Sequence, residues 1–262
     1  MSAVETLGTT TPAGTTPAGT TLDATPHAVP VVVDPRYTGP AGSGHGGVTA
    51  GYAAALVDPR RAVVRLHAAI PLGTPLVPRS RADGAVVLHA GPVPVATARR
   101  GGPWDVPPFE PAPPALVRAA ERHWLDARAG VHPHPRCFGC GPDRVDGLGL
   151  RPGPVRGRGV HATRWVPPGE GEVPSWLLWA ALDCASAGPV LGAAARGGPL
   201  TGELAVEQRL PVAAGRRHTL YARTARRRGR RVVTEAALLD DRGLHAAVAV
   251  VTWFVTGSEV PS

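Results

Sequence analysis

The fold is decided by residues 175–187, which read Ser-Trp-Leu-Leu-Trp-Ala-Ala-Leu-Asp-Cys-Ala-Ser-Ala. This stretch predicts a helix that is apolar on all sides and carries a single carboxylate, Asp183. A helix that is apolar all round is a buried helix. Because a buried carboxylate is costly unless it is paired, hydrogen bonded or protonated, Asp183 is expected to have either a structural partner or a catalytic role.

Segments with the character of β-strands surround this helix. One precedes it at 160–166, and four follow it at 202–210, 219–226, 231–239 and 244–254. Turn residues separate the later segments, at Gly229 and at Asp241-Arg242-Gly243. The pattern predicts a strand, a long helix and then four antiparallel strands.

The first part of the chain shows the same order of elements. A β-branched run at 28–33 leads through the glycine-rich loop 37–47 into an apolar helix at 48–57. Four further strands are predicted, at 62–70, 76–81, 85–89 and 93–98. We interpret the repeated order as a diverged internal duplication.

The composition divides the chain into four parts. Residues 1–26 contain Thr-Thr-Pro-Ala-Gly twice and are predicted to be a disordered tail. The first domain is expected at 27–105 and the second at 151–258. Between them, 106–150 is predicted to be a linker with an amphipathic helix near 114–128.

Two motifs resemble a known family. One long helix wrapped by a five-stranded antiparallel sheet, occurring twice, resembles a double hotdog. Gly44-His45-Gly46-Gly47 resembles the His-Gly-Gly motif of hotdog acyl-CoA thioesterases related to the phenylacetate-pathway enzymes, and Cys137-Phe138-Gly139-Cys140-Gly141 with 179–184 resembles thioesterase-like proteins of actinobacteria. The resemblance spans 28–256. It implies an α+β protein of two tandem hotdog domains packed as an internal pseudo-dimer.

The resemblance also implies one composite site. In such thioesterases, glycine amides at the start of one subunit's helix face a carboxylate on the other subunit's helix, about nine residues after the motif histidine. That position is Ala54 in the first half, and the matching histidine position in the second half is Pro174. Each half therefore lacks one component, and a single site of His45, Gly46 and Gly47 opposite Asp183 is expected.

These residues point to hydrolysis of an acyl thioester. The amides of Gly46 and Gly47 would stabilise the oxyanion, while Asp183 would act as general base or as nucleophile. His45 would orient the carbonyl or the water, or it is a loop histidine bonded to backbone. Two alternatives remain open, namely a hotdog dehydratase or hydratase acting on 3-hydroxyacyl thioesters and a non-catalytic protein that binds acyl chains or other hydrophobic ligands.

Further residues are candidates for binding the substrate, either an acyl-CoA or an acyl-carrier-protein thioester. Trp176 and Trp179 are predicted to line the pocket. Arg226, Arg228 and Arg230 straddle Gly229 and either contact the phosphates of coenzyme A or form a solvated strand end. No cofactor is predicted.

The three cysteines, Cys137, Cys140 and Cys184, are too few for a disulfide scaffold. His132 and His134 precede the first two with the spacing His-x-His-x-x-Cys-x-x-Cys, which offers nitrogen and sulfur ligands for zinc. The spacing is unusually compact and no second cysteine pair exists. A turn that packs the linker against the second domain is therefore favoured, and no metal is predicted.

The net charge of +8 among 262 residues comes from 28 basic residues that are all arginine, in a chain without lysine or asparagine. This composition indicates coding bias, and no aromatic residues interleave with the arginines to stack nucleic-acid bases, so nucleic acid is not expected as a partner.

No apolar run approaches the roughly 20 residues of a membrane helix. Without a signal peptide, the protein is predicted to be cytoplasmic. Further pairing of two chains through sheet edges is left open.

Overall fold

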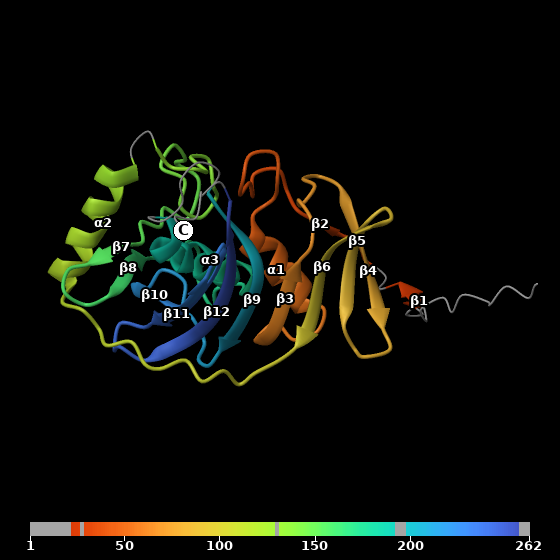
Figure 1. The fold of residues 1–262 in the computed structure, drawn as a ribbon. Coiled ribbons are helices and arrows are strands. Elements are labelled where there is room, and N and C mark those ends of the chain that lie inside the picture. Colours follow the sequence, from red (N-terminus) through yellow and green to blue (C-terminus); the bar gives the residue numbers. More distant parts are fainter. Residues whose placement is uncertain (1–21, 27–28, 129–130, 192–197, 257–262) are drawn as a thin grey trace, which may run out of the picture.

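The structure, a computed structural model, describes residues 22–26, 29–128, 131–191 and 198–256. Its paired strands are antiparallel and form one long sheet (Figure 1). Two helices, α1 (Gly46–Ala55) and α3 (Ser175–Leu191), pack against each other and against this sheet. A third helix, α2 (Pro114–Arg128), lies at one end of the sheet, beside the strands β7 (Gly153–Val155) and β8 (Val160–Trp165).

The strands around α1 pair in a simple order. They are β2 (Val31–Val32), β3 (Arg61–Leu66), β4 (Pro75–Arg81), β5 (Val86–Ala90) and β6 (Val93–Arg100). The pairing runs β2-β4-β5-β6-β3. The strand that follows the helix therefore lies at one end of the run, and the strand that precedes it lies at the other.

The strands around α3 repeat that order. They are β8 (Val160–Trp165), β9 (Pro199–Gln208), β10 (His218–Arg228), β11 (Arg231–Leu239) and β12 (His245–Val255). The pairing runs β8-β10-β11-β12-β9, and a short strand, β7 (Gly153–Val155), extends it beyond β8. Each predicted strand segment of this half contains or overlaps one of these strands.

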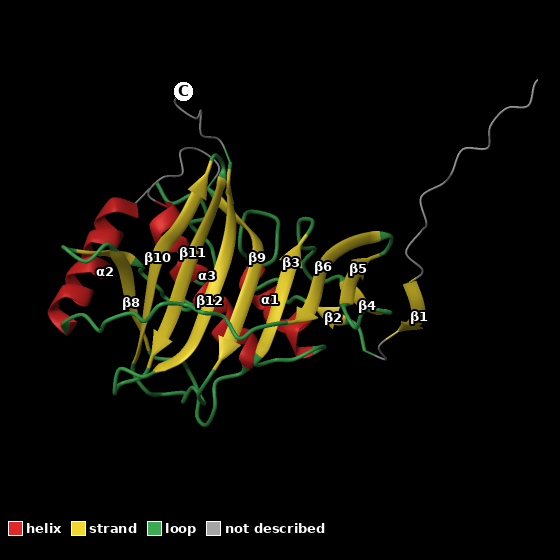
Figure 2. Ribbon diagram, turned by 60° about the horizontal axis from the view of Figure 1, so that its bottom comes forward, coloured by secondary structure: helices red, strands yellow, loops and turns green. Residues whose placement is uncertain are grey.

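The two runs meet at β3 and β9. Val63 pairs with Ala205 and Val64 with Leu204, so the sheet continues without a break from one half to the other (Figure 2). The sequence pattern predicted one sheet around each helix. In the structure the two predicted sheets are joined through β3 and β9. Two edge strands that pair in this way satisfy each other's backbone hydrogen-bonding groups.

The N-terminal segment differs from its prediction. Of the expected tail 1–26, residues 1–21 lie outside the described residues, whereas Leu22–Pro26 forms strand β1 and pairs with β4. The exposed edge of β4 offers the unpaired backbone groups that make such an addition favourable. The expected strand at 28–33 is reduced to β2, and residue 28 is also outside the described residues.

The connecting segment, residues 101–113, runs from β6 to α2 across the strands of the second half (Figure 2). Because side chains alternate along β12, Ala249 and Val251 belong to the core beneath α3 while Val248 packs in a second cluster with Phe109 of the connecting segment. The Ala112 amide donates to the Tyr221 hydroxyl at 2.8 Å. The connecting segment therefore covers the face of the sheet opposite α3.

Helix α2 has the amphipathic character that its sequence predicts. Val117, Ala120 and Trp124 are buried on its inner face. Glu121 is also buried and accepts hydrogen bonds from the backbone and side chain of Arg164 in β8. No helix among the described residues is long and apolar enough to cross a membrane.

Helices α1 and α3 approach closely because two residues of α1 have no side chain. A Cβ atom on Gly47 would lie 2.6 Å from the Asp183 Cβ and 2.8 Å from the Ala180 Cα. One turn later, a Cβ on Gly51 would overlap the Cα of Trp176. These contacts are with backbone atoms or with side-chain atoms next to the backbone, which cannot move without shifting the helix.

We expect Gly51→Ala to lower the free energy of unfolding by about 1 to 3 kcal/mol, because the added methyl group has to push the helices apart. Urea unfolding measures this change. Ala55→Ser alters an exposed position of the same helix and should change stability by no more than about 0.5 kcal/mol. A Gly51→Ala protein as stable as the wild type would contradict the close crossing.

Candidate functional site

A cavity of about 540 Å³ opens where α1 begins and the second half of α3 runs past it. This volume lies within the range of small-molecule binding sites. Its wall is formed by the loop before α1, the loop after β3, residues 132–140, α3 and the ends of β9 and β12. The lining includes Ile70, Leu66, Leu191, Leu200, Phe254, His45, Gly46, Asp183 and Cys184.

Asp183 is buried at this wall and has specific partners. Its Oδ2 accepts a hydrogen bond from the Gly47 amide at 2.7 Å, and its Oδ1 accepts one from the Thr201 hydroxyl at 2.9 Å. The Nδ1 atom of His45 lies 3.6 Å from Oδ2. Burial raises the pKa of Asp183 above its ordinary value, although His45, Thr201 and the Gly47 amide favour the carboxylate.

The start of α1 is organised by His45. This residue is the N-cap of the helix, and its Nδ1 accepts a hydrogen bond from the Val48 amide at 3.3 Å. The Gly47 amide is engaged by Asp183, so it is not free to bind an oxyanion. The Gly46 amide, by contrast, makes no hydrogen bond within the described part of the chain, and Gly46 lines the cavity.

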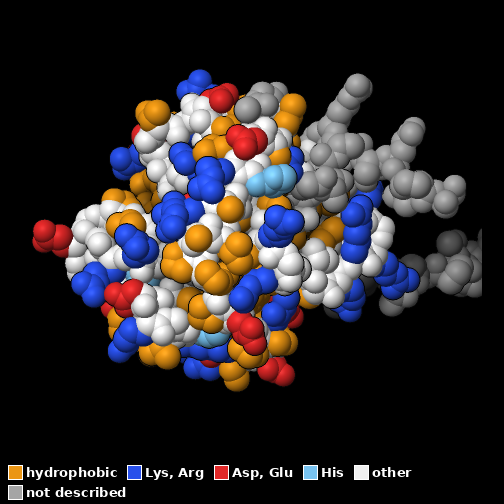
Figure 3. Space-filling model, turned by 90° about the vertical axis from the view of Figure 1, so that its left-hand side faces the viewer, with side chains coloured by type: hydrophobic (Ala, Val, Ile, Leu, Met, Phe, Trp, Pro, Cys, Tyr) orange, Lys and Arg blue, Asp and Glu red, His pale blue; other side chains and the backbone are white. Residues whose placement is uncertain are grey.

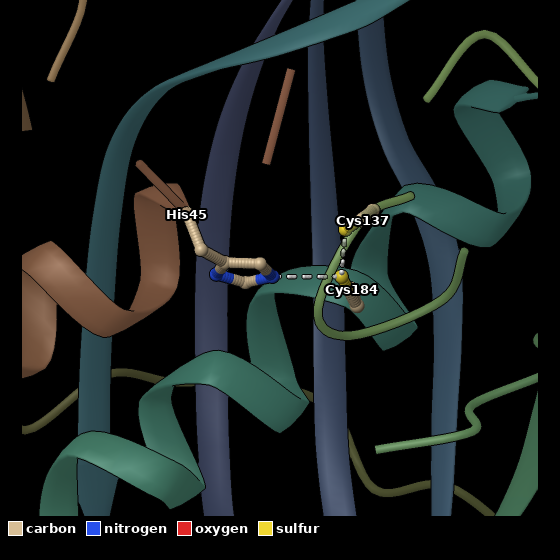
Figure 4. Close-up of side chains that lie close together, drawn as sticks. All are labelled: His45, Cys137 and Cys184. Atoms are coloured by element: carbon tan, nitrogen blue, oxygen red, sulfur yellow. Dashed lines mark hydrogen bonds between the residues drawn. The ribbon is translucent and has the colours of Figure 1, made fainter. Parts of the chain in front are cut away.

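Three thiols lie on the other side of His45. The Sγ of Cys184 is 3.1 Å from the His45 Nε2, and the Sγ of Cys137 is 3.6 Å from that of Cys184 (Figure 4). Hydrogen bonds from the Cys140 and Cys184 thiols lower the pKa of Cys137 well below its ordinary value. Burial lowers the pKa of His45, but Cys137 and Asp183 more than offset this effect, so the pKa is raised overall.

The histidines grouped with Cys137 and Cys140 in the sequence lie apart from His45 and Cys184. His132 is buried with its Nε2 at 3.7 Å from the Cys140 Sγ, and burial lowers its pKa to about 4. The Nε2 of His134 lies 3.3 Å from the carbonyl oxygen of Pro199. The compact set of two histidines and two cysteines does not form a single cluster.

The two tryptophans predicted to line the pocket do not line this cavity. Trp179 is fully buried and its Nε1 donates to the Pro59 carbonyl at 3.4 Å. Trp176 packs against Tyr37 and Tyr52 in tilted arrangements, with ring centroids 5.0 and 5.8 Å away. Both side chains lie over Gly51, so they fill the helix crossing instead.

The predicted arginines also lie outside the cavity wall. Arg226 and Arg228 border a separate hollow of about 330 Å³ together with Arg231 and Val233, and Arg230 is exposed at the hairpin tip. Arg231 pairs in the sheet with Phe254, which lines the main cavity, so the hairpin neighbours that cavity. Figure 3 shows basic side chains on the side of the molecule that carries α2, interspersed with hydrophobic and acidic ones.

The sequence analysis missed two contributors to this site, Thr201 and Cys184. Cys184 directly follows Asp183, and this position next to the candidate carboxylate was the available signal. Nothing in the sequence singles out Thr201, because it reaches Asp183 only through the placement of β9 beside α3.

Neither a protein-family model nor a curated protein matches this sequence. Solved structures do match it. A candidate thioesterase II from Thermobifida fusca is 15% identical, with 87% of this chain and 91% of that chain covered and a TM-score of 0.58.

Two other solved structures are also similar to this chain over most of its length. The acyl-CoA thioesterase II TesB2 from Mycobacterium marinum is 13% identical over 84% of this chain and 92% of that chain, with a TM-score of 0.53. A conserved protein of unknown function with a hotdog fold from Alicyclobacillus acidocaldarius is 14% identical over 85% and 90%, with a TM-score of 0.52. The chain therefore has a hotdog fold, as predicted.

We expect Thr201→Val to lower the free energy of unfolding by about 1.5 to 3 kcal/mol, because Asp183 loses a donor to its charged form. Urea denaturation checks this value. Thr224→Val, at an exposed position of β10, makes the same change away from the site and should be nearly neutral. Equal effects of the two substitutions would argue against a specific Thr201–Asp183 bond.

Proposed function

We propose that the protein hydrolyses acyl thioesters at one composite site between two fused hotdog units. The observation that carries the proposal is the buried carboxylate of Asp183 on α3, which lies against the first turn of α1 at the wall of a largely apolar cavity. A carboxylate beside helix-start amides and an acyl-sized cavity suits thioester chemistry. The names of the thioesterase neighbours support the same reaction class.

The tandem arrangement is part of this proposal. The runs β2-β4-β5-β6-β3 and β8-β10-β11-β12-β9 have the same pairing order, and each packs on its own helix. We interpret the two halves as domains 27–105 and 151–258 that form an internal pseudo-dimer. The site then takes His45 and Gly46 from the first half and Asp183 from the second.

The reaction assigns a separate task to each group. The acyl chain occupies the cavity beside Ile70 and Leu200, and the carbonyl oxygen binds the free amide of Gly46 at the positive end of α1. Asp183 takes a proton from water while the water oxygen attacks the carbonyl carbon. The tetrahedral intermediate then breaks its carbon–sulfur bond, and the leaving thiolate recovers the proton from Asp183.

The partners of Asp183 favour the role of general base over that of nucleophile. Two donors, Gly47 and Thr201, hold the two carboxylate oxygens in place. A raised pKa makes the carboxylate a stronger base than an exposed aspartate. His45 is a positioning residue, since it caps α1 and thereby orients the amides of Gly46 and Gly47.

The coenzyme A part of a substrate would lie toward the β10–β11 hairpin. Arg226, Arg228 and Arg230 are exposed there, and the neighbouring Phe254 belongs to the cavity wall. Guanidinium groups suit the phosphates of coenzyme A because they bind phosphate oxygens in pairs. An acyl-carrier-protein thioester presents its phosphate to the same arginines.

We expect wild-type protein to release free thiol from some members of a panel of short, medium, long and aromatic acyl-CoA thioesters. In Asp183→Asn the rate should fall by about 100- to 10,000-fold, because the general base is lost. Asp105→Asn, which neutralises an exposed carboxylate of the connecting segment, should retain full activity. Circular dichroism establishes that each variant is folded.

The same panel separates the other activities. Absence of thiol release from every member would overturn the hydrolase proposal. A change of enoyl absorbance without thiol release would indicate a dehydratase or hydratase. Thermal stabilisation by an acyl thioester without either reaction would indicate a binding protein.

The hairpin has its own test. The double variant Arg226→Gln, Arg228→Gln should raise KM for an acyl-CoA by about tenfold, because charge-assisted contacts to phosphate are lost. KM for the corresponding acyl-pantetheine, which lacks phosphates, should not change. Arg118→Gln on α2 removes an exposed arginine elsewhere and serves as the control. Equal effects on both substrates would remove the hairpin from the binding site.

A further inference from the structure

Three side chains from separate segments converge beside Asp183. His45 begins α1, Cys137 belongs to the turn at 137–141, and Cys184 is on α3 (Figure 4). The His45 Nε2, the Cys137 Sγ and the Cys184 Sγ all lie within 4.8 Å of one another, and all three residues are buried. The shortest separations are 3.1 Å from nitrogen to sulfur and 3.6 Å between sulfurs.

These separations are close to those in a tetrahedral zinc site. Zinc bonds of about 2.3 Å to sulfur and about 2.0 to 2.1 Å to nitrogen place the donor atoms roughly 3.5 to 3.8 Å apart. The separations of Cys184 from His45 and from Cys137 would need to change by only tenths of an ångström to match these values. Thiolate and imidazole are also the donor types that zinc prefers in structural sites.

A fourth donor is adjacent. Cys140 is buried three residues after Cys137, and its Sγ lies 3.7 Å from the His132 Nε2, so its side chain would have to turn toward the other three donors to join them. Cys137 and Cys140 share a tight turn that is closed by a 2.9 Å hydrogen bond from the Gly141 amide to the Cys137 carbonyl. Two cysteines separated by two residues are a common way for one turn to supply two zinc ligands.

We infer that the protein binds one zinc ion through His45, Cys137, Cys140 and Cys184. This is a closed set of three cysteines and one histidine, which is typical of a structural zinc site. The inference is independent of thioester hydrolysis. It also differs from the set suggested by the sequence spacing, because His45 and Cys184 replace His132 and His134.

The surroundings of the cluster suit a metal ion. Zinc-bound histidines usually donate their second ring N–H to a carboxylate. Zinc at the His45 Nε2 would place the ring proton on Nδ1, which would then face the Asp183 Oδ2 at 3.6 Å instead of accepting from the Val48 amide. Three thiolates and one Zn²⁺ carry a net charge of −1. The guanidinium groups of Arg128 and Arg144 are close enough to interact electrostatically with Cys140 and His45, respectively, and would offset this charge.

The turn is also shaped to reach the cluster. A Cβ atom on Gly139 would overlap the Cys184 Sγ and lie 3.0 Å from the His45 Nε2, so only glycine permits this approach. A metal held here would tie residues 137–141 of the linker to the start of α1 and to α3. A zinc ion would thus cross-link residues 137–141, the start of α1 and α3, which enclose one side of the cavity.

The experiment measures metal content in the full chain, expressed without a metal-binding tag and dialysed under reducing conditions. We expect about one zinc per chain by mass spectrometry of the elements. Cys137→Ser and Cys184→Ser should each lose most of it. His134→Gln, whose ring contacts the Pro199 carbonyl instead, is the matched control and should retain the zinc.

Cobalt substitution provides a second measurement that does not depend on folded variants. Metal-free wild-type protein titrated with Co²⁺ should develop sulfur-to-cobalt charge-transfer bands in the near ultraviolet and visible bands of tetrahedral cobalt at one equivalent. Asp183→Asn removes the carboxylate but no ligand, so its cobalt complex should keep the charge-transfer bands. This variant also separates the two proposals, because its hydrolysis and its metal content are expected to respond differently.

Two results would overturn the inference. One is wild-type protein with less than about 0.1 zinc per chain and no charge-transfer band with Co²⁺. The other is a disulfide between Cys137 and Cys184, detected by mass spectrometry of the unreduced protein. If zinc remains in Cys184→Ser but leaves in His134→Gln, the ion uses the ligand set of the sequence spacing and the assignment made here is wrong.

Discussion

The hydrogen bond from the Gly47 amide to the Asp183 carboxylate joins the two central helices, and the rest of the structure is arranged around it. A buried carboxylate is stable only with donors close to both oxygens. The amide supplies one donor and Thr201 supplies the other. The amide can come this close only because Gly47 and Gly51 allow the backbones of α1 and α3 almost to touch.

This crossing determines where the cavity lies. The first turn of α1 lies against Asp183 of α3. The loop that precedes α1 therefore forms one wall of the cavity, and the second half of α3 forms another. The pairing of β3 with β9 closes the sheet behind the two helices, so the cavity opens beside the helix ends. The first half supplies the free amide of Gly46, and the second half supplies the carboxylate.

Asp183 has two neighbourhoods with different chemistry. On one side it faces Gly46 and the apolar cavity, where its basicity would serve the proposed hydrolysis of a thioester. On the other side it faces His45, whose second ring nitrogen points to the thiols. The two proposed roles are compatible, because a carboxylate that would orient a zinc-bound histidine through one oxygen retains lone pairs toward the cavity.

The amino-acid sequence by itself determined the elements and their order, since periodicity and turn residues report local structure. It predicted the strand at 231–239 with its observed bounds, the amphipathic α2 and the pairing of His45 with Asp183 across the halves. Only the tertiary structure decided which way the side chains of the wholly apolar α3 point, because such a helix has no polar face to orient it. The packing of Trp176 and Trp179 at the crossing, the β3–β9 junction and the convergence of Cys137 with Cys184 all depend on contacts between segments far apart in the chain.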